Sequence, residues 1–131
     1  MVRRYEDLDC WRLANDLKRA VYGLLEESAS ARKDLDFASQ LRDAASSGPA
    51  NISEAFACYR HKESGRYARI AKASLTETHN HLGDGVDRGY WTAARITSER
   101  KLAERAIGAT TKWMAYLSSS DEPPPHSAPS T

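Results

Sequence analysis

The chain has 131 residues, of which 40% are hydrophobic and 28% carry a charged side chain. This length and composition are typical of one soluble globular domain with a core of its own. The formal net charge is only +1, which excludes nucleic-acid binding driven by bulk charge, so any such affinity has to come from local clusters of cations.

The N-terminal part predicts a first helix that follows a short extended arm at residues 1–6. Asp7 can accept amide hydrogen bonds as the N-cap of this helix. Apolar residues then recur over residues 8–25 in a stripe that is wider than one bundle seam needs. Residues 26–34 are small and polar, so they predict a loop or a frayed end, and Asp34 can cap the next helix.

A second helix is predicted because apolar residues recur at spacings of three, four and seven. These residues are Phe37, Leu41, Ala44, Ala45, Ile52 and Phe56. Pro49 has no amide hydrogen, and its ring clashes with the carbonyl of residue 45, so a straight helix cannot pass through it. We favour a helix kinked at Pro49; two helices with a break at Ser47-Gly48 are the alternative.

Two polar residues follow the proline. The Asn51 amide can donate to a carbonyl that Pro49 leaves without a donor, and Glu54 can accept from a neighbouring amide or pair with an arginine. A structural role for both is favoured over ligand binding, because a broken helix creates backbone groups that need partners.

The third helix is predicted from Lys62 to Arg88, where Gly89 ends it as a left-handed C′ residue. Its predicted core face consists of Tyr67, Ile70, Ala71, Ser74, Leu75, Thr78 and Leu82. Thr92 can cap a fourth helix over residues 93–117, which has to run antiparallel to the third.

The composition changes after Leu117 to a Pro- and Ser-rich segment without large apolar residues, so residues 118–131 predict a disordered tail. Residues 1–117 then form a single domain. Long helices joined by short polar connections predict an all-α, up-down-up-down antiparallel four-helix bundle.

Residues 47–56, Ser-Gly-Pro-Ala-Asn-Ile-Ser-Glu-Ala-Phe, follow Gln40-Leu41-Arg42. Together they resemble the signature QIRRA…SIPANIAEGF of a four-helix bundle family first noticed as proteins encoded by intervening sequences in bacterial 23S rRNA genes. The accessory variability proteins of diversity-generating retroelements belong to the same group. Further matches are Tyr5-Glu6-Asp7-Leu8, Trp11, Ala14, Lys62-Glu63, Ala73-Ser74-Leu75, Glu77 and Gly89-Tyr90. The resemblance covers about residues 5–117, and its structural signature falls on Pro49, Asn51, Ile52, Glu54 and Phe56.

The resemblance implies a homopentamer and, for the retroelement branch, an RNA-binding partner of a reverse transcriptase. The chain departs from the signature at Gly48, Ala55 and Arg60. Ala55 matters most, because a glycine that uses positive φ cannot become alanine without strain. Either the backbone at Ala55 is helical or the loop is shifted.

Nothing in the sequence predicts an enzyme. The Glu-x-x-His pattern of a di-iron bundle is absent, and His79 and His81 cannot chelate one ion because they are two apart on a helix. Cys58 and His61 lie one turn apart but lack an oxyanion site and an orienting third group. We therefore expect no metal, no cofactor and no catalysis.

The cysteines and the hydropathy also bear on location. Cys10 and Cys58 form no Cys-x-x-Cys pair, residues 1–11 lack the apolar region of a secretory leader, and no window approaches 18 consecutive apolar residues. We expect two thiols in a reducing compartment, no membrane segment and a cytoplasmic protein.

One cluster of cations could carry a function. It consists of Arg60, Lys62, Arg66, Arg69 and Lys72, beside the single acidic residue Glu63. Lys62, Arg66 and Arg69 share one helix face at i, i+4 and i+7, and Tyr59 is close enough to stack on a base. An ordinary solvated helix face is the alternative interpretation.

The predicted function is that of a non-enzymatic oligomeric bundle that binds RNA or DNA as an accessory factor. In a symmetric oligomer the cations would repeat as a ring of basic charge. Self-association is also predicted by the excess apolar width of the first helix and by Leu102, Trp113, Met114 and Tyr116 around the fourth. The alternative is a structural or protein-binding oligomer with no affinity for nucleic acid.

Overall fold

The computed structural model describes residues 2–58 and 61–119, and for His61 it describes the backbone alone. These residues form one short 3₁₀-helix and five α-helices, four of them long, and they contain no strand. The elements are η1 (Tyr5–Asp7), α1 (Asp9–Glu27), α2 (Ala29–Lys33), α3 (Leu35–Ala57), α4 (His61–Asp87) and α5 (Thr97–Ser119). The predicted all-α class is therefore confirmed. The predicted tail, apart from Ser118 and Ser119 in α5, lies outside the described residues.

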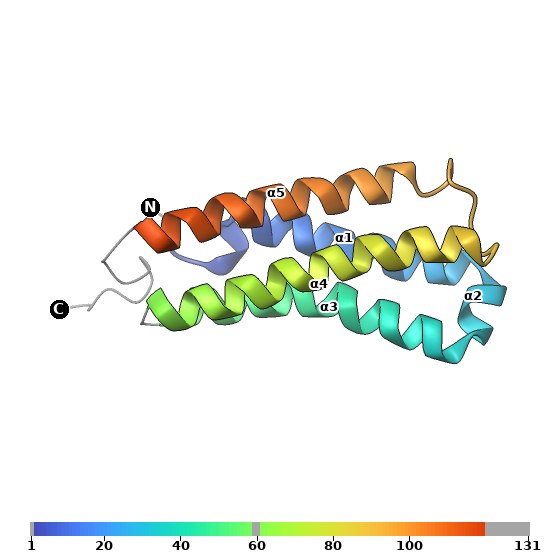
Figure 1. The fold of residues 1–131 in the computed structure, drawn as a ribbon, viewed down its shortest axis with the longest axis horizontal. Coiled ribbons are helices and arrows are strands. Elements are labelled where there is room, and N and C mark those ends of the chain that lie inside the picture. Colours follow the sequence, from blue (N-terminus) through green and yellow to red (C-terminus); the bar gives the residue numbers. More distant parts are fainter. Residues whose placement is uncertain (1, 59–60, 120–131) are drawn as a thin grey trace.

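The long helices run side by side, and the chain reverses direction from each long helix to the next (Figure 1). Helix α1 packs against α3 and α5, and α4 packs against the same two helices. Long helices that are adjacent in the sequence are thus adjacent in space, which agrees with the predicted up-down-up-down bundle. In Figure 1, α4 and α5 lie in front and α1 and α3 lie behind them.

The start of α1 differs from the prediction. Residues 5–7 form the 3₁₀ turn η1, and the N-cap position of α1 falls on Leu8, which makes no side-chain cap hydrogen bond. Asp7 therefore does not cap α1. Its carboxylate instead lies 3.8 Å from the guanidinium groups of Arg4 and Arg12, because the turn places it one residue before the cap position.

The predicted loop at residues 26–34 is also wrong, because α1 continues to Glu27 and the short helix α2 follows. Ser28 starts α2 by accepting a hydrogen bond from the amide of Ala31 at 3.2 Å. Arg32 donates back to the carbonyls of Leu25 and Glu26 at the end of α1. These side chains supply partners for helix ends that composition alone does not reveal.

Helix α3 begins at the predicted cap, where Asp34 accepts a hydrogen bond from the amide of Phe37 at 3.2 Å. The helix is continuous through Pro49, so the alternative of two helices with a break before it is wrong. The kink at Pro49 stays a prediction. Gly48 is buried, and a Cβ atom there would lie 2.9 Å from Cδ2 of Leu75, so α4 packs closely against this part of α3.

Asn51 has the predicted structural role with a different partner. Its amide donates to the carbonyl of Ser47 at 2.9 Å rather than to that of residue 45, and also to the Ser47 hydroxyl. Ser74 of α4 donates to the same hydroxyl at 2.7 Å, so this network joins α3 to α4. Ala55 lies within α3, so its backbone is helical, and its side chain is fully buried. Glu54 is exposed and pairs with no described side chain.

Helix α4 buries one regular stripe of side chains. The stripe consists of Ser64, Ala68, Ala71, Ser74, Leu75, Thr78 and Leu82. The prediction that Ile70 belongs to the core is wrong, because this side chain is 42% exposed. Position 70 lies on the flank of the stripe, and a helical period alone does not separate a flank from a core position.

The turn after α4 closes as predicted at Gly89, which has φ of +82°. The amide of Tyr90 donates to the carbonyl of Gly85 and the amide of Gly89 to that of Val86, both at 2.9 Å, which is the Schellman pattern. Helix α5 starts at Thr97 rather than at residue 93. Thr92 accepts from the amide of Arg95 at 3.1 Å and so caps a turn that precedes the helix.

Candidate nucleic-acid interface

Four of the predicted cations lie in the first half of α4 and are called the basic row: Lys62, Arg66, Arg69 and Lys72. The first three are exposed, and Lys72 is half-buried on the flank of the helix. Within the described part of the chain, none of the four forms an ion pair with a carboxylate. The fifth predicted cation, Arg60, and the predicted stacking residue Tyr59 lie outside the described residues.

A local contact positions one arginine of the basic row. The guanidinium of Arg66 lies 5.5 Å from the centre of the Tyr67 ring, in reach of a cation–π interaction. Arg66 and Arg69 are both exposed, so phosphate oxygens can reach their charged groups.

The helix dipole of α4 does not account for the basic row. Lys62 shares the first turn with Glu63, and of the two the dipole favours only the carboxylate, by about 0.3–1 kcal/mol. Arg66, Arg69 and Lys72 lie beyond the first turn, where the effect of the dipole has fallen off.

Helix α5 extends this basic region. Its second half lies beside the first half of α4, because the two helices pack antiparallel (Figure 1). From Arg105 to Ser119 it carries Arg105 and Lys112 but no aspartate or glutamate. We call the part of the bundle formed by the start of α1, the start of α4 and the end of α5 the terminal end.

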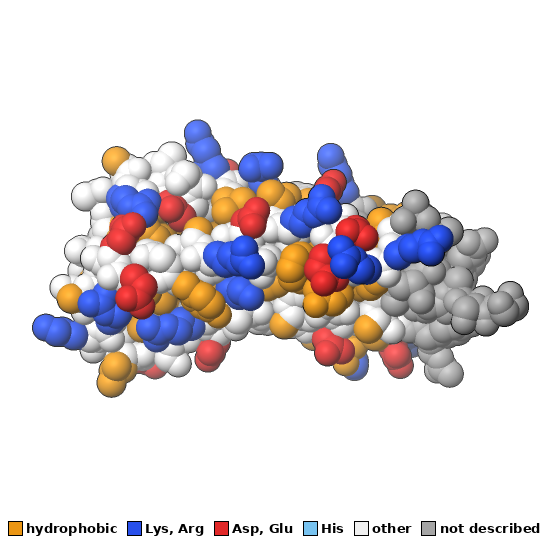
Figure 2. Space-filling model, turned by 180° about the vertical axis from the view of Figure 1, so that it is seen from behind, with side chains coloured by type: hydrophobic (Ala, Val, Ile, Leu, Met, Phe, Trp, Pro, Cys, Tyr) orange, Lys and Arg blue, Asp and Glu red, His pale blue; other side chains and the backbone are white. Residues whose placement is uncertain are grey.

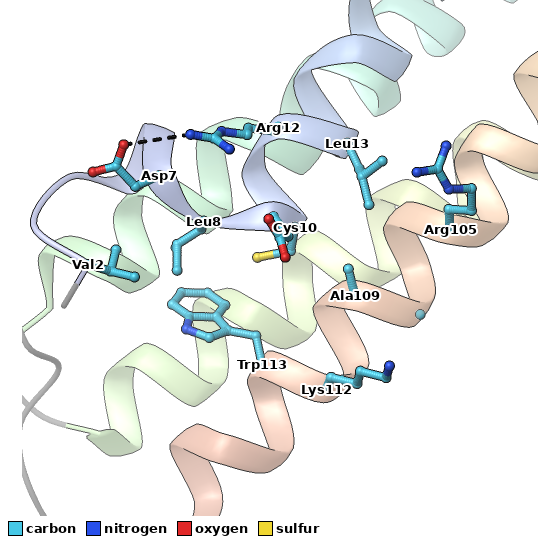
Figure 3. Close-up of a pocket in the computed structure, with 12 residues that line it drawn as sticks. Val2, Asp7, Leu8, Cys10, Arg12, Leu13, Arg105, Ala109, Lys112 and Trp113 are labelled. Carbon is cyan, nitrogen blue, oxygen red and sulfur yellow. Dashed lines mark ion pairs between the residues drawn. The ribbon is translucent and has the colours of Figure 1, made fainter.

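A cleft of about 840 Å³ opens at the terminal end between α5 and the beginning of the chain, and we call it the α1–α5 cleft (Figure 3). Leu8, Leu13, Ala109 and Trp113 give it an apolar floor, and Arg105 and Lys112 line its α5 side. Asp7, Asp9 and Arg12 line its other side. This cleft was not predicted from the sequence; its signals there are the wide apolar stripe of the first helix and Trp113.

Both cysteine thiols have a raised pKa. Cys10 lies in the α1–α5 cleft and is buried, and burial raises its pKa to about 12, so the thiol stays protonated at neutral pH. The pKa of Cys58 is also raised, first by burial and then by the nearby carboxylates of Glu63 and Glu54.

Two of the histidines of α4, His79 and His81, contact different carboxylates. His79 lies 3.1 Å from Glu104 of α5, and Nη2 of Arg100 lies 3.4 Å from its other ring nitrogen. Because Arg100 can only donate, Nδ1 accepts and Nε2 carries the proton that Glu104 binds. His81 lies 3.3 Å from Glu77. Among the described residues, no three metal-ligating side chains come together.

The opposite end of the bundle, which we call the turn end, contains α2, the start of α3 and the Gly89 turn. Asp34 there accepts hydrogen bonds from Tyr90 and from Arg88, the latter at 2.9 Å. The hydrogen bond from Tyr90 is the main cause that holds the pKa of Asp34 below its ordinary value, and the bond from Arg88 acts in the same direction. The hydrogen bond to Asp34 in turn raises the pKa of Tyr90. This cluster fixes the turn onto α3.

Aromatic side chains fill the space beneath that cluster. The Phe37 ring lies 5.1 Å from the Tyr90 ring and 6.0 Å from the Trp91 ring. Trp91 is 7% exposed, and its indole donates to the carbonyl of Leu24 at 3.0 Å. The turn end therefore serves stability, and the candidate interface lies at the terminal end.

The described residues therefore define a helical-bundle protein whose helix α4 presents cations that form no ion pair with a described carboxylate. The family model described as 23S rRNA-intervening sequence protein matches residues 6–111, so the chain belongs to that family. The comparison with curated proteins gave no match.

Four of the five residues of the predicted structural signature are buried or hydrogen-bonded within the bundle, whereas the fifth, Glu54, is exposed. Pro49, Ile52 and Phe56 are buried in α3, and Asn51 joins α3 to α4 through Ser47. None of the described helices has the length and apolar character needed to cross a membrane.

Proposed function

We propose that this protein is a non-enzymatic accessory factor that binds nucleic acid, RNA or DNA, through the basic row of α4. The observation that carries the proposal is that Lys62, Arg66 and Arg69 are exposed on one face of α4 and that no cation of the basic row forms an ion pair with a described carboxylate. Arginines elsewhere behave differently: Arg88 binds Asp34 and Asp84, and Arg95 binds Glu27 and Glu99. Cations without such partners can bind phosphates and release condensed counterions.

We further propose that the chain acts as a homo-oligomer in the cytoplasm. Large apolar side chains remain exposed on several helices, namely Tyr22, Leu35, Ile70 and Tyr116. Figure 2 shows hydrophobic side chains between the charged ones on the face of the bundle that is turned away in Figure 1. Association would cover such surface and would repeat the basic row around a symmetry axis, so that phosphate contacts add. Five copies in the oligomer and a reverse transcriptase as partner are proposed from the family resemblance. The kink in α3 is proposed from the presence of Pro49 within the helix.

The test compares the parent with Arg66→Glu/Arg69→Glu in gel shifts on a duplex RNA at about 50 mM and 200 mM salt, a range over which phosphate contacts weaken strongly. We expect binding that falls steeply with salt and is lost in the double variant. Both side chains are exposed, so circular dichroism and the mass from light scattering should match the parent.

A matched control is Arg19→Glu/Arg42→Glu, which makes the same change in net charge at two exposed positions on α1 and α3. This variant should keep most of the affinity. Absence of any shift for the parent at the lower salt would leave a structural or protein-binding oligomer as the better account. Equal loss in both double variants would show that net charge, and not the basic row, determines binding.

A further inference from the structure

The charges of the α1–α5 cleft are not balanced within the chain. Asp7 lies near the guanidinium groups of Arg4 and Arg12, so its charge is compensated. Asp9, Arg105 and Lys112 form no ion pair with a described side chain. Two cations and one carboxylate thus remain around an apolar floor.

The floor contains an aromatic ring that is only half-buried. Figure 3 shows the indole of Trp113 directed into the space beside Leu8 and Val2, with Arg105 and Lys112 on the same helix. Single-stranded nucleic acids are bound where unstacked bases lie on aromatic rings and phosphates meet nearby cations. A carboxylate beside such a ring can accept a hydrogen bond from an exocyclic amino group of a base.

The exposed positions of α5 beside the cleft include residues that are small and uncharged, namely Gly108, Thr111 and Ala115. A Cβ atom at Gly108 would have no neighbour within 4 Å, so packing inside the chain does not require glycine there. Glycine within a helix is unfavourable relative to alanine, and it permits close approach of another molecule's backbone.

We infer that the α1–α5 cleft binds one unpaired base of a single-stranded nucleic acid that also contacts the basic row, an inference that rests on the proposed function. Trp113 stacks on the base, Asp9 accepts from its amino group, and Arg105 and Lys112 bind the flanking phosphates. A base in a duplex cannot enter, because its faces are covered by stacking. The protein therefore prefers single strands.

The size of the cleft favours a base over a second copy of the chain. About 840 Å³ lies within the range of about 300–1,000 Å³ that holds small molecules. A helix of another copy is about 10–12 Å in diameter and would need a longer groove. The excess of cations over carboxylates also suits a phosphodiester.

The experiment measures binding of a labelled single-stranded RNA of about 12 nucleotides, a length within usual site sizes, and of its duplex. The parent should bind the single strand about ten-fold more tightly, since stacking on one aromatic ring contributes that much or more. Trp113→Phe should keep this preference and Trp113→Leu should lose it. Equal affinities of the parent for both RNAs would overturn the inference.

A second pair of variants avoids the core. Gly108→Glu places a carboxylate between Arg105 and Lys112, and Gly23→Glu makes the same change at an exposed glycine of α1 that also has no neighbour within 4 Å. We expect Gly108→Glu to weaken single-strand binding about ten-fold or more, as loss of a base contact does, and Gly23→Glu to leave it nearly unchanged. Equal behaviour of the two variants contradicts the cleft as a base site.

The outcomes separate the two proposals. Loss of all binding in Arg66→Glu/Arg69→Glu together with equal binding of single strand and duplex by the parent supports the basic row and overturns the cleft inference. Absence of binding to either RNA overturns both. A lower oligomer mass for Gly108→Glu in light scattering would assign the cleft to contact between copies and would overturn it as a base site.

Discussion

The turn end and the terminal end use the same types of residue in different ways. At the turn end, Arg88 and Arg95 bind carboxylates, and Trp91 is buried with its indole bonded to a carbonyl. At the terminal end, the basic row has no described carboxylate partner, and Trp113 borders a cleft. Charges satisfied within the chain contribute to folding, whereas charges left exposed and unpaired remain available to a ligand.

The largest expected change in the free energy of unfolding comes from truncating Trp91, the tryptophan of the turn end. Trp91→Ala removes a side chain that is 7% exposed and packs on Phe37, so we expect unfolding to become easier by about 3–5 kcal/mol. Trp113→Ala should cost less because this indole is half-buried. Urea denaturation measures both, and equal losses would contradict the contrast between the ends.

Next in size is a change at Gly85, which lies in α4 against the ring of Trp91. A Cβ atom there would lie 2.7 Å from Cε3 of Trp91 and 3.1 Å from Cζ of Phe37. Gly85→Ala should therefore destabilise the fold by about 1–3 kcal/mol through overpacking, less what alanine gains as a helix former. At the terminal end, Gly108→Ala meets no neighbour and should stabilise by about 0.5–1 kcal/mol. The same sign in both variants would show that the turn end is not tightly packed.

The features that could be predicted from the sequence are those set by residues close together in the chain. Asp34 as a cap, Gly89 as a helix end and the buried stripe around Leu75 follow from local chemistry and a 3.6-residue period. The basic row could also be predicted, because Lys62, Arg66 and Arg69 are spaced so that they share one face of a helix. The α1–α5 cleft depends on the start of the chain meeting Trp113, and no local pattern reports which distant residues meet.

The errors have a similar origin. Ile70 has the right period but lies on the flank of the buried stripe, and the position of that stripe is set by how α3 and α5 pack on α4. Because residues 5–7 form a 3₁₀ turn, the N-cap position of α1 lies at Leu8, one residue after the expected Asp7, and composition does not reveal this shift. Tertiary packing decided both positions.

A third prediction uses pH. The pKa of Asp34 is lowered in the folded chain, so the unfolded chain takes up the proton first as the pH falls. Stability from this group is present above about pH 4, near the ordinary pKa of aspartate, and is lost as the pH falls through the folded value. The Tm of the parent should therefore drop on acidification, and that of Asp34→Asn should drop less, since asparagine keeps the cap.

The control for this measurement is an exposed aspartate of α3 outside the cluster, Asp43→Asn, which forms no ion pair among the described residues. Its Tm should follow the parent at each pH. Should Asp34→Asn also follow the parent, the hydrogen bonds from Tyr90 and Arg88 contribute no pH-dependent stability to the turn end.

The smallest effect is expected at the basic row. Lys62→Gln, Arg66→Gln and Arg69→Gln should each change the free energy of unfolding by no more than about 0.5 kcal/mol, as for most surface substitutions. Arg95→Gln, which loses Glu27 and Glu99, should lower the Tm instead. Thermal unfolding by circular dichroism distinguishes them, and a clear loss of Tm at the basic row would mean that its cations serve the fold.

The order of the helices around the bundle has a kinetic consequence. Helices α3 and α4, and α4 and α5, are joined by short connections, whereas α1 and α5 are the most distant long helices in the sequence and still pack together. Forming that contact closes the longest loop and carries the largest chain-entropy cost, so it is expected to form late and to open first. Amide hydrogen exchange along the facing sides of α1 and α5 should therefore be faster than at the α3–α4 contact.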